Sequence, residues 1–183
     1  MKTNAKKCGL LREGFRQCQM IGICALVLIL LLVILQAISG YIDYSNENSL
    51  YTAQAYQMNL GALLAIPMTF FMMLRLFRFL NNRAASDFYH ALPHKRLFLY
   101  ESFIGAIILW ILIWVVGSML VTTLLCCMQP NLQLLYNTIL PYTLSVIFMC
   151  LLTASGTLLV MGITGTGFTN VVLSLVLLFI PRF

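Results

Sequence analysis

Long apolar stretches alternate with short polar segments along this chain of 183 residues. Residues 17–42, 48–74 and 102–181 contain no Asp, Glu, Lys, Arg or His. A helix that crosses a bilayer needs roughly 20 apolar residues. The first two stretches therefore each have room for one span, and the third, which is 80 residues long, has room for three. The pattern predicts four complete spans at 20–38, 58–74, 103–125 and 140–162, and a fifth hydrophobic segment at 168–180.

Composition points to the same class of protein. Hydrophobic residues make up 61% of the chain and charged residues only 9%, whereas about a quarter of the residues of a soluble domain are charged. A soluble protein with so apolar a core would need charged surface between its elements, and this chain has almost none there. We therefore expect an all-α fold, a polytopic transmembrane helix bundle in which residues 1–183 form a single transmembrane domain.

The segment before the first span, residues 1–19, is basic and has a helical pattern. Its apolar and charged side chains fall on opposite faces of a helix, which allows two interpretations. One is a short amphipathic helix lying on the membrane surface, and the other is a basic flank that only sets the topology. The apolar face consists of Leu10, Leu11 and Phe15, opposite Arg12, Glu13 and Arg16.

Basic residues are distributed unequally between the two sides of the predicted membrane. Segment 1–19 contains five Lys or Arg residues and the connection after the second span contains another five, whereas loops 39–57 and 126–139 contain none. The positive-inside rule therefore places the N-terminus and the connection 75–101 in the cytoplasm. The net charge of +6 is explained by this topology and by attraction to anionic lipid headgroups rather than by nucleic-acid binding. The basic residues of the connection are Arg75, Arg78, Arg83, Lys95 and Arg96.

Several residues within the spans indicate packing rather than chemistry. Pro67 is expected to kink the second span because proline removes a backbone hydrogen bond. Small residues at 154–156 favour close approach of another helix, and Trp110 and Trp114 fit packing or lipid contacts better than a ligand cage. The six cysteines lack CxxC spacing and neighbouring histidines, so we expect buried apolar thiols and no metal site.

The connection between the second and third spans is predicted to contain a short helix. Ser86 is a suitable N-cap, Asp87 would lie in the first turn where the helix dipole favours negative charge, and Pro93 would end the helix. Such a helix fits docking against another protein, or alternatively it lies on lipid with its aromatic rings among the headgroups. Its large apolar side chains are Phe88, Tyr89 and Leu92.

The same connection resembles the inner loop of ABC-2 type permeases, the membrane subunits of ATP-binding cassette transporters found mostly in Gram-positive bacteria. The segment Gly14 to Arg16 before the first span resembles theirs as well. The resemblance covers the N-terminal part of the chain, and the later spans resemble the family only in hydropathy. The residues that carry it in the connection are Phe77, Arg78, Phe79 and Leu80, then Ser86, Asp87, Phe88, Tyr89, His90, Ala91, Leu92 and Pro93, and finally Lys95 and Arg96.

The resemblance implies a permease subunit in a bacterial plasma membrane, paired with a second permease copy or paralogue and driven by a separate cytoplasmic ATPase subunit. ATP and Mg²⁺ would be bound by that subunit, because this chain contains no GxxxxGK[ST] phosphate loop and we expect no cofactor in it. By this analogy a coupling helix would contact the ATPase, and its closure would tilt the second and third spans. The contact residues would be Ser86, Asp87, Phe88, Tyr89, His90, Leu92 and Pro93.

Other functions compete with this interpretation. Permeases of this type have at least six spans, so a truncated permease fragment without autonomous activity is one alternative, and a non-transporting membrane scaffold is another. An ion-coupled carrier would place ionisable residues within its spans, and the predicted spans contain no Asp, Glu, Lys, Arg or His. His90 and His94 have no carboxylate pair or nucleophile beside them, so we expect neither enzymatic activity nor a metal site.

Overall fold

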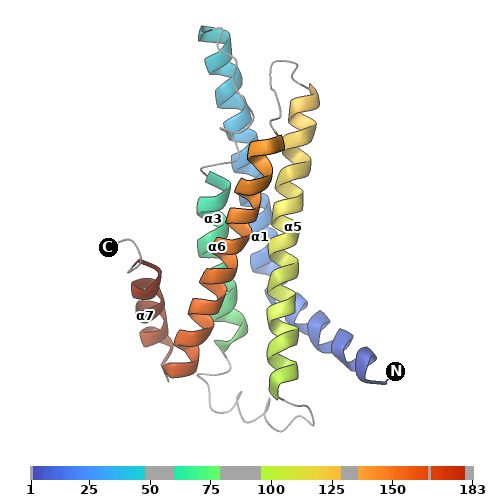
Figure 1. The fold of residues 1–183 in the computed structure, drawn as a ribbon, viewed down its shortest axis with the longest axis vertical. Helices are drawn as coiled ribbons and strands as arrows, with labels where there is room; N and C mark the ends of the chain where they lie inside the picture. The colour runs from blue at the N-terminus through green and yellow to red at the C-terminus, as the bar shows by residue number, and fades with distance from the viewer. Residues whose placement is uncertain (1, 48–59, 79–95, 129–135, 165, 180–183) are drawn as a thin grey trace. The chain divides into compact units, whose positions relative to one another are not determined.

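A computed structural model of the chain describes residues 2–47, 60–78, 96–128, 136–164 and 166–179. All regular structure in these ranges is helical, which confirms the all-α prediction for them. Figure 1 shows the helices, coloured along the chain. They are α1 (Lys2–Glu47), α3 (Leu60–Leu76), α5 (Arg96–Met128), α6 (Tyr136–Ile163) and α7 (Gly167–Phe179).

Three of these helices are long and apolar enough to cross a membrane. Their apolar parts are Gly9–Ile38 in α1, Phe98–Leu125 in α5 and Leu140–Ile163 in α6, with 30, 28 and 24 residues. The shorter apolar helices, Leu64–Leu76 and Gly167–Leu177, lie where a second span and a fifth segment are predicted. The fold therefore indicates a membrane protein, and the count of four complete spans plus a fifth segment stays a prediction.

Large apolar side chains on the outer faces of the helices support a hydrocarbon environment. Leu35 in α1 is 51% exposed, Leu124 in α5 is 63% exposed and Phe148 in α6 is 62% exposed. Monomeric soluble proteins rarely expose apolar patches larger than a few hundred Å². Lipid chains remove the unfavourable contact with water, so these side chains fit a membrane-facing surface.

Helix boundaries differ from the sequence-based prediction most clearly at the end of α1 and at the start of α5. Helix α1 runs without a break from the predicted leader through the first span to Glu47, so residues 41–47 of the predicted polar loop are helical. Helix α5 begins at Arg96, so the first residues of the third helix lie in the predicted connection 75–101. A helix can continue beyond the point where hydropathy falls, and residues 41–47 contain neither Gly nor Pro, the residues that most often end one. Helix α3 also continues through Pro67.

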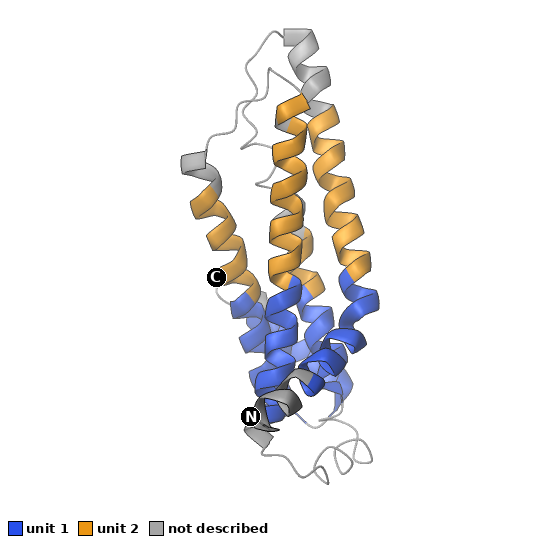
Figure 2. Ribbon diagram, turned by 90° about the vertical axis from the view of Figure 1, so that its right-hand side faces the viewer, with its two compact units in different colours: residues 1–22, 69–110, 151–183 blue, residues 23–68, 111–150 orange. Residues whose placement is uncertain are grey.

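The residues divide into two compact units, which Figure 2 shows in different colours. Unit 1 comprises residues 1–22, 69–110 and 151–183, and unit 2 comprises residues 23–68 and 111–150. In unit 2 the buried face of α1 repeats every four residues, as expected for one side of a helix. This face consists of Ala25, Ile29, Val33 and Ala37.

Within unit 1, two glycines of α1 allow aromatic rings of α5 to approach closely. A Cβ atom added to Gly14 would lie 2.9 Å from Cδ1 of Phe103, and one added to Gly22 would lie 2.5 Å from Cδ2 and Cε2 of Trp110. The Trp110 ring also stacks on Phe15, with ring centroids 4.6 Å apart and planes at 6°. Any larger residue at these two positions would place its Cβ atom too close to an aromatic ring, so the packing requires glycine.

The same contacts show what the apolar face of the predicted leader, residues 1–19, packs against. Arg12 and Arg16 are exposed, whereas Phe15 is half-buried and stacks on Trp110 of α5. Trp110 is 4% exposed and, in unit 2, Trp114 is 2% exposed. Of the two expected roles for the tryptophans, packing is therefore confirmed. The apolar face of the leader packs on a helix, a contact that neither interpretation of the sequence included.

Candidate functional site at the ends of α3 and α5

All residues of the predicted coupling helix lie outside the described part of the chain. This holds for all the predicted ATPase contacts and for two of the five basic residues. Arg75 lies in the last turn of α3, Arg78 follows that helix, and Arg96 is the first residue of α5. The residues outside the described ranges are Arg83, Ser86, Asp87, Phe88, Tyr89, His90, Leu92, Pro93 and Lys95.

Three aromatic residues join the two helix ends that flank this connection. Phe77, which follows α3, stacks on Tyr100 of α5 with ring centroids 5.7 Å apart and planes at 15°. Phe77 also meets Phe103 edge to face, at 6.1 Å and 76°. Phe77 and Phe103 are both 0% exposed. We call Phe77, Tyr100 and Phe103 the aromatic cluster.

The aromatic cluster is positioned by ordinary helix geometry. The backbone N–H of Phe77 donates to the carbonyl of Met73 at 3.0 Å, which extends the helical turn beyond Leu76. Tyr100 and Phe103 are three residues apart on α5 and therefore lie on one face of that helix. Aromatic pairs contribute roughly 0.5–1.5 kcal/mol beyond their area burial. Displacement of one end of the connection is therefore expected to displace the other.

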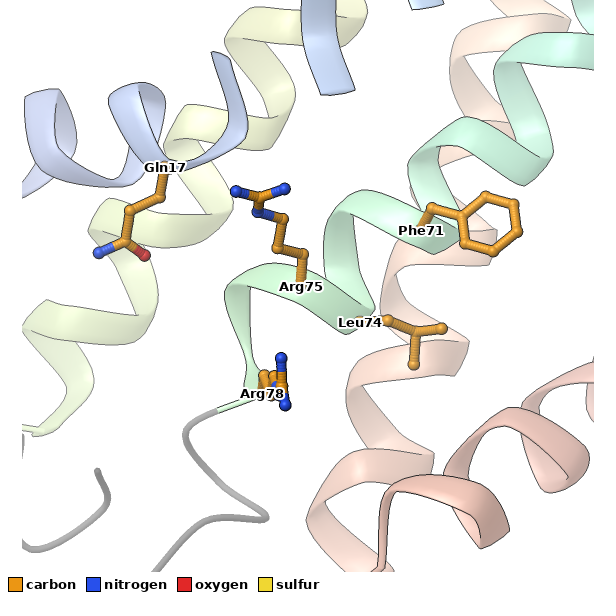
Figure 3. A pocket seen from close by; sticks show the side chains of 5 residues that line it. All are labelled: Gln17, Phe71, Leu74, Arg75 and Arg78. Carbon is orange, nitrogen blue, oxygen red and sulfur yellow. The ribbon is translucent and has the colours of Figure 1, made fainter. Parts of the chain in front are cut away.

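Two arginines beside the aromatic cluster line a hollow. Its volume is about 690 Å³, and Figure 3 shows the side chains that surround it. In Figure 3 the Arg75 side chain extends from α3 toward α1, the helix that carries Gln17. Both Arg75 and Arg78 are exposed. We call this the basic hollow, and its lining residues are Gln17, Phe71, Leu74, Arg75 and Arg78.

Buried polar residues on α6 and α7 form a feature that sequence reasoning missed. Thr157 on α6 donates to the carbonyls of Thr153 and Ala154, both at 2.9 Å. Asn170 and Ser174 on α7 are 0% exposed, and among the described residues neither side chain has a hydrogen-bond partner. Their spacing of four residues within an apolar helix was the available signal, since it places both on one face.

This unpaired face leads to a stability prediction. We expect Asn170→Leu to raise the free energy of unfolding by about 1 kcal/mol, because a buried unpaired amide costs about 1–3 kcal/mol and leucine has the same branched shape without polar atoms. Resistance to unfolding by sodium dodecyl sulfate in mixed micelles would measure the change. Thr157→Val is the matched control, and we expect it to be neutral or destabilising because it removes a hydroxyl that is already paired. A loss of stability in Asn170→Leu would contradict the prediction.

The cysteines differ in how deeply they are buried. Cys18 and Cys150 are buried as expected, whereas Cys24 and Cys127 are exposed. The expectation of buried thiols is therefore wrong for those two, which lie on outward faces of long helices. Among the described residues no group of three or more His, Cys, Asp or Glu side chains has a geometry that could hold a metal ion.

The fold and this site define a helical membrane protein with a basic, aromatic junction between two apolar helices. No protein-family model, curated protein or solved structure matches the chain.

Proposed function

We propose that this chain is a permease subunit of an ATP-binding cassette transporter in a bacterial plasma membrane. In this proposal its N-terminus is cytoplasmic, it pairs with a second permease subunit, and a separate subunit hydrolyses ATP. The apolar helices support a role within the bilayer. The sequence of connection 77–96, which resembles the inner loop of ABC-2 type permeases, supports the assignment to transport.

The single observation that carries the proposal is the aromatic cluster. A permease must convert a push on its cytoplasmic loop into movement of the helices on both sides of that loop. Phe77 and Tyr100, which flank the connection on the α3 and α5 sides, are stacked 5.7 Å apart. A force applied between them therefore acts on α3 and α5 together, as the coupling mechanism requires.

Co-purification with an ATPase tests the proposal. If a neighbouring gene encodes a phosphate-loop ATPase, we expect it to co-purify with this chain, and Phe88→Ala/Tyr89→Ala/Leu92→Ala to reduce its recovery at least about tenfold. Truncating central aromatic side chains in an interface commonly costs 2 kcal/mol or more. The matched control is Phe148→Ala/Leu144→Ala, which changes exposed apolar residues of α6.

The outcomes separate the candidate functions. Unchanged recovery of the ATPase with the triple variant would refute the coupling-helix hypothesis. Absence of any ATPase partner would instead favour the non-transporting scaffold. A complex that forms but hydrolyses ATP without moving any substrate would favour the truncated permease fragment.

A further inference from the structure

The basic hollow is amphipathic, with apolar side chains at one end and two arginines at the other. Phe71, Leu74, Arg75 and Arg78 follow the spacing i, i+3, i+4 and i+7, which places them on one face of the α3 helix and its last turn. Phe71 is 53% exposed and stands at the apolar end, while the two arginines stand at the other. At 1.5 Å per residue the face extends roughly 10 Å, about the depth over which a lipid passes from headgroup to acyl chain.

The charge of the basic hollow is not neutralised by the described residues. No described carboxylate forms an ion pair with Arg75 or Arg78. Glu13 accepts a hydrogen bond from Nε2 of Gln17, another lining residue, at 3.5 Å. Two guanidinium groups that lack a carboxylate partner favour a phosphate, whose oxygens they can bind through paired N–H donors.

We propose that the basic hollow is a binding site for an anionic phospholipid. The phosphate would be held by Arg75 and Arg78, and the first part of an acyl chain would lie on Phe71 and Leu74. A free phosphate would leave the apolar half of the hollow unused, so the pairing of basic and apolar halves favours a lipid. Basic pockets between transmembrane helices commonly bind such headgroups. This proposal does not depend on transport activity.

Lipid retention by the full chain tests the basic half of the site. In native mass spectrometry from a neutral detergent, we expect bound phosphatidylglycerol in preference to phosphatidylcholine with the same acyl chains. Arg75→Gln/Arg78→Gln should weaken this binding roughly 30-fold, from about 1 kcal/mol for each arginine. Arg12→Gln/Arg16→Gln is the matched control, since it removes the same charge from exposed positions of α1 and should change binding less than threefold.

A further variant distinguishes the loss of positive charge from a loss of correct folding. Arg75→Lys/Arg78→Lys keeps the charge and should retain most of the binding, with the loss limited to the paired N–H donors. Equal retention of phosphatidylglycerol by the glutamine variant and by its α1 control would overturn the proposal. So would equal retention of the two lipids by the unmodified chain.

The apolar half of the site has its own test. Phe71→Ala/Leu74→Ala should weaken phosphatidylglycerol binding roughly tenfold through lost apolar contact, while Leu144→Ala/Phe148→Ala on α6 should not. Inorganic phosphate should fail to displace the lipid. Displacement by inorganic phosphate, together with unchanged binding in the α3 variant, would show that the site takes a free anion and would overturn the assignment to a lipid.

Discussion

Gly22→Val should lower the free energy of unfolding of this protein by about 3 kcal/mol, at the upper end of the usual cost of overpacking. A Cβ atom at this position would lie 2.5 Å from Cδ2 and Cε2 of Trp110, and these atoms belong to the rigid part of the indole ring. The ring has little freedom to withdraw, because Trp110 is 4% exposed and stacks on Phe15 at 4.6 Å. Either α1 must move away from α5 or the tryptophan must leave its position.

A matched glycine in the same helix separates the clash from helix propensity. Gly9→Val introduces the same branched side chain into α1, but a Cβ atom at Gly9 meets nothing within 4 Å. We therefore expect Gly9→Val to change stability by less than about 1 kcal/mol. Unfolding in mixed micelles followed by circular dichroism would compare the two. Equal losses would contradict the packing argument, whereas recovery of stability in Gly22→Val/Trp110→Leu would support it.

The presence of the helices was predictable from sequence, and their boundaries were less so. Stretches free of charged residues predicted helices where α1, α5 and α6 are found, because the apolar length of a span is set by the bilayer. Hydropathy did not predict that α1 continues to Glu47 or that α5 begins at Arg96. Those ends depend on backbone interruption and capping, and hydropathy carries no information about either.

The candidate site was predictable in its charges and not in its contacts. The positive-inside pattern identified Arg75 and Arg78 as basic residues at a helix end, and both are exposed there. The aromatic cluster depends on which helices are neighbours and on their rotation, and a single sequence specifies neither. The contact between Gly22 and Trp110 was missed for the same reason, since neither residue is unusual within its own helix.

The second large effect is expected at the aromatic cluster. Phe77→Ala should lower the free energy of unfolding by about 3–5 kcal/mol, the usual cost of truncating a buried phenylalanine. Phe77 is 0% exposed, so its ring leaves a cavity that its neighbours can fill only in part. Phe168→Ala on α7 is the matched control, because that ring is 82% exposed and its loss should be almost neutral. Similar losses in both variants would contradict the prediction.

A double-mutant cycle then tests whether the cluster joins the two helices. Unfolding free energies of Phe77→Ala, Tyr100→Ala and the double variant should give a coupling energy of about 0.5–1.5 kcal/mol, because the rings stack 5.7 Å apart. Residues that do not interact are additive within about 0.3–0.5 kcal/mol. A coupling energy no larger than about 0.3–0.5 kcal/mol would mean that the two helix ends are energetically independent. A push on the connection would then have no route through Phe77 into α5, and the main support for the permease proposal would be lost even if an ATPase bound to the connection.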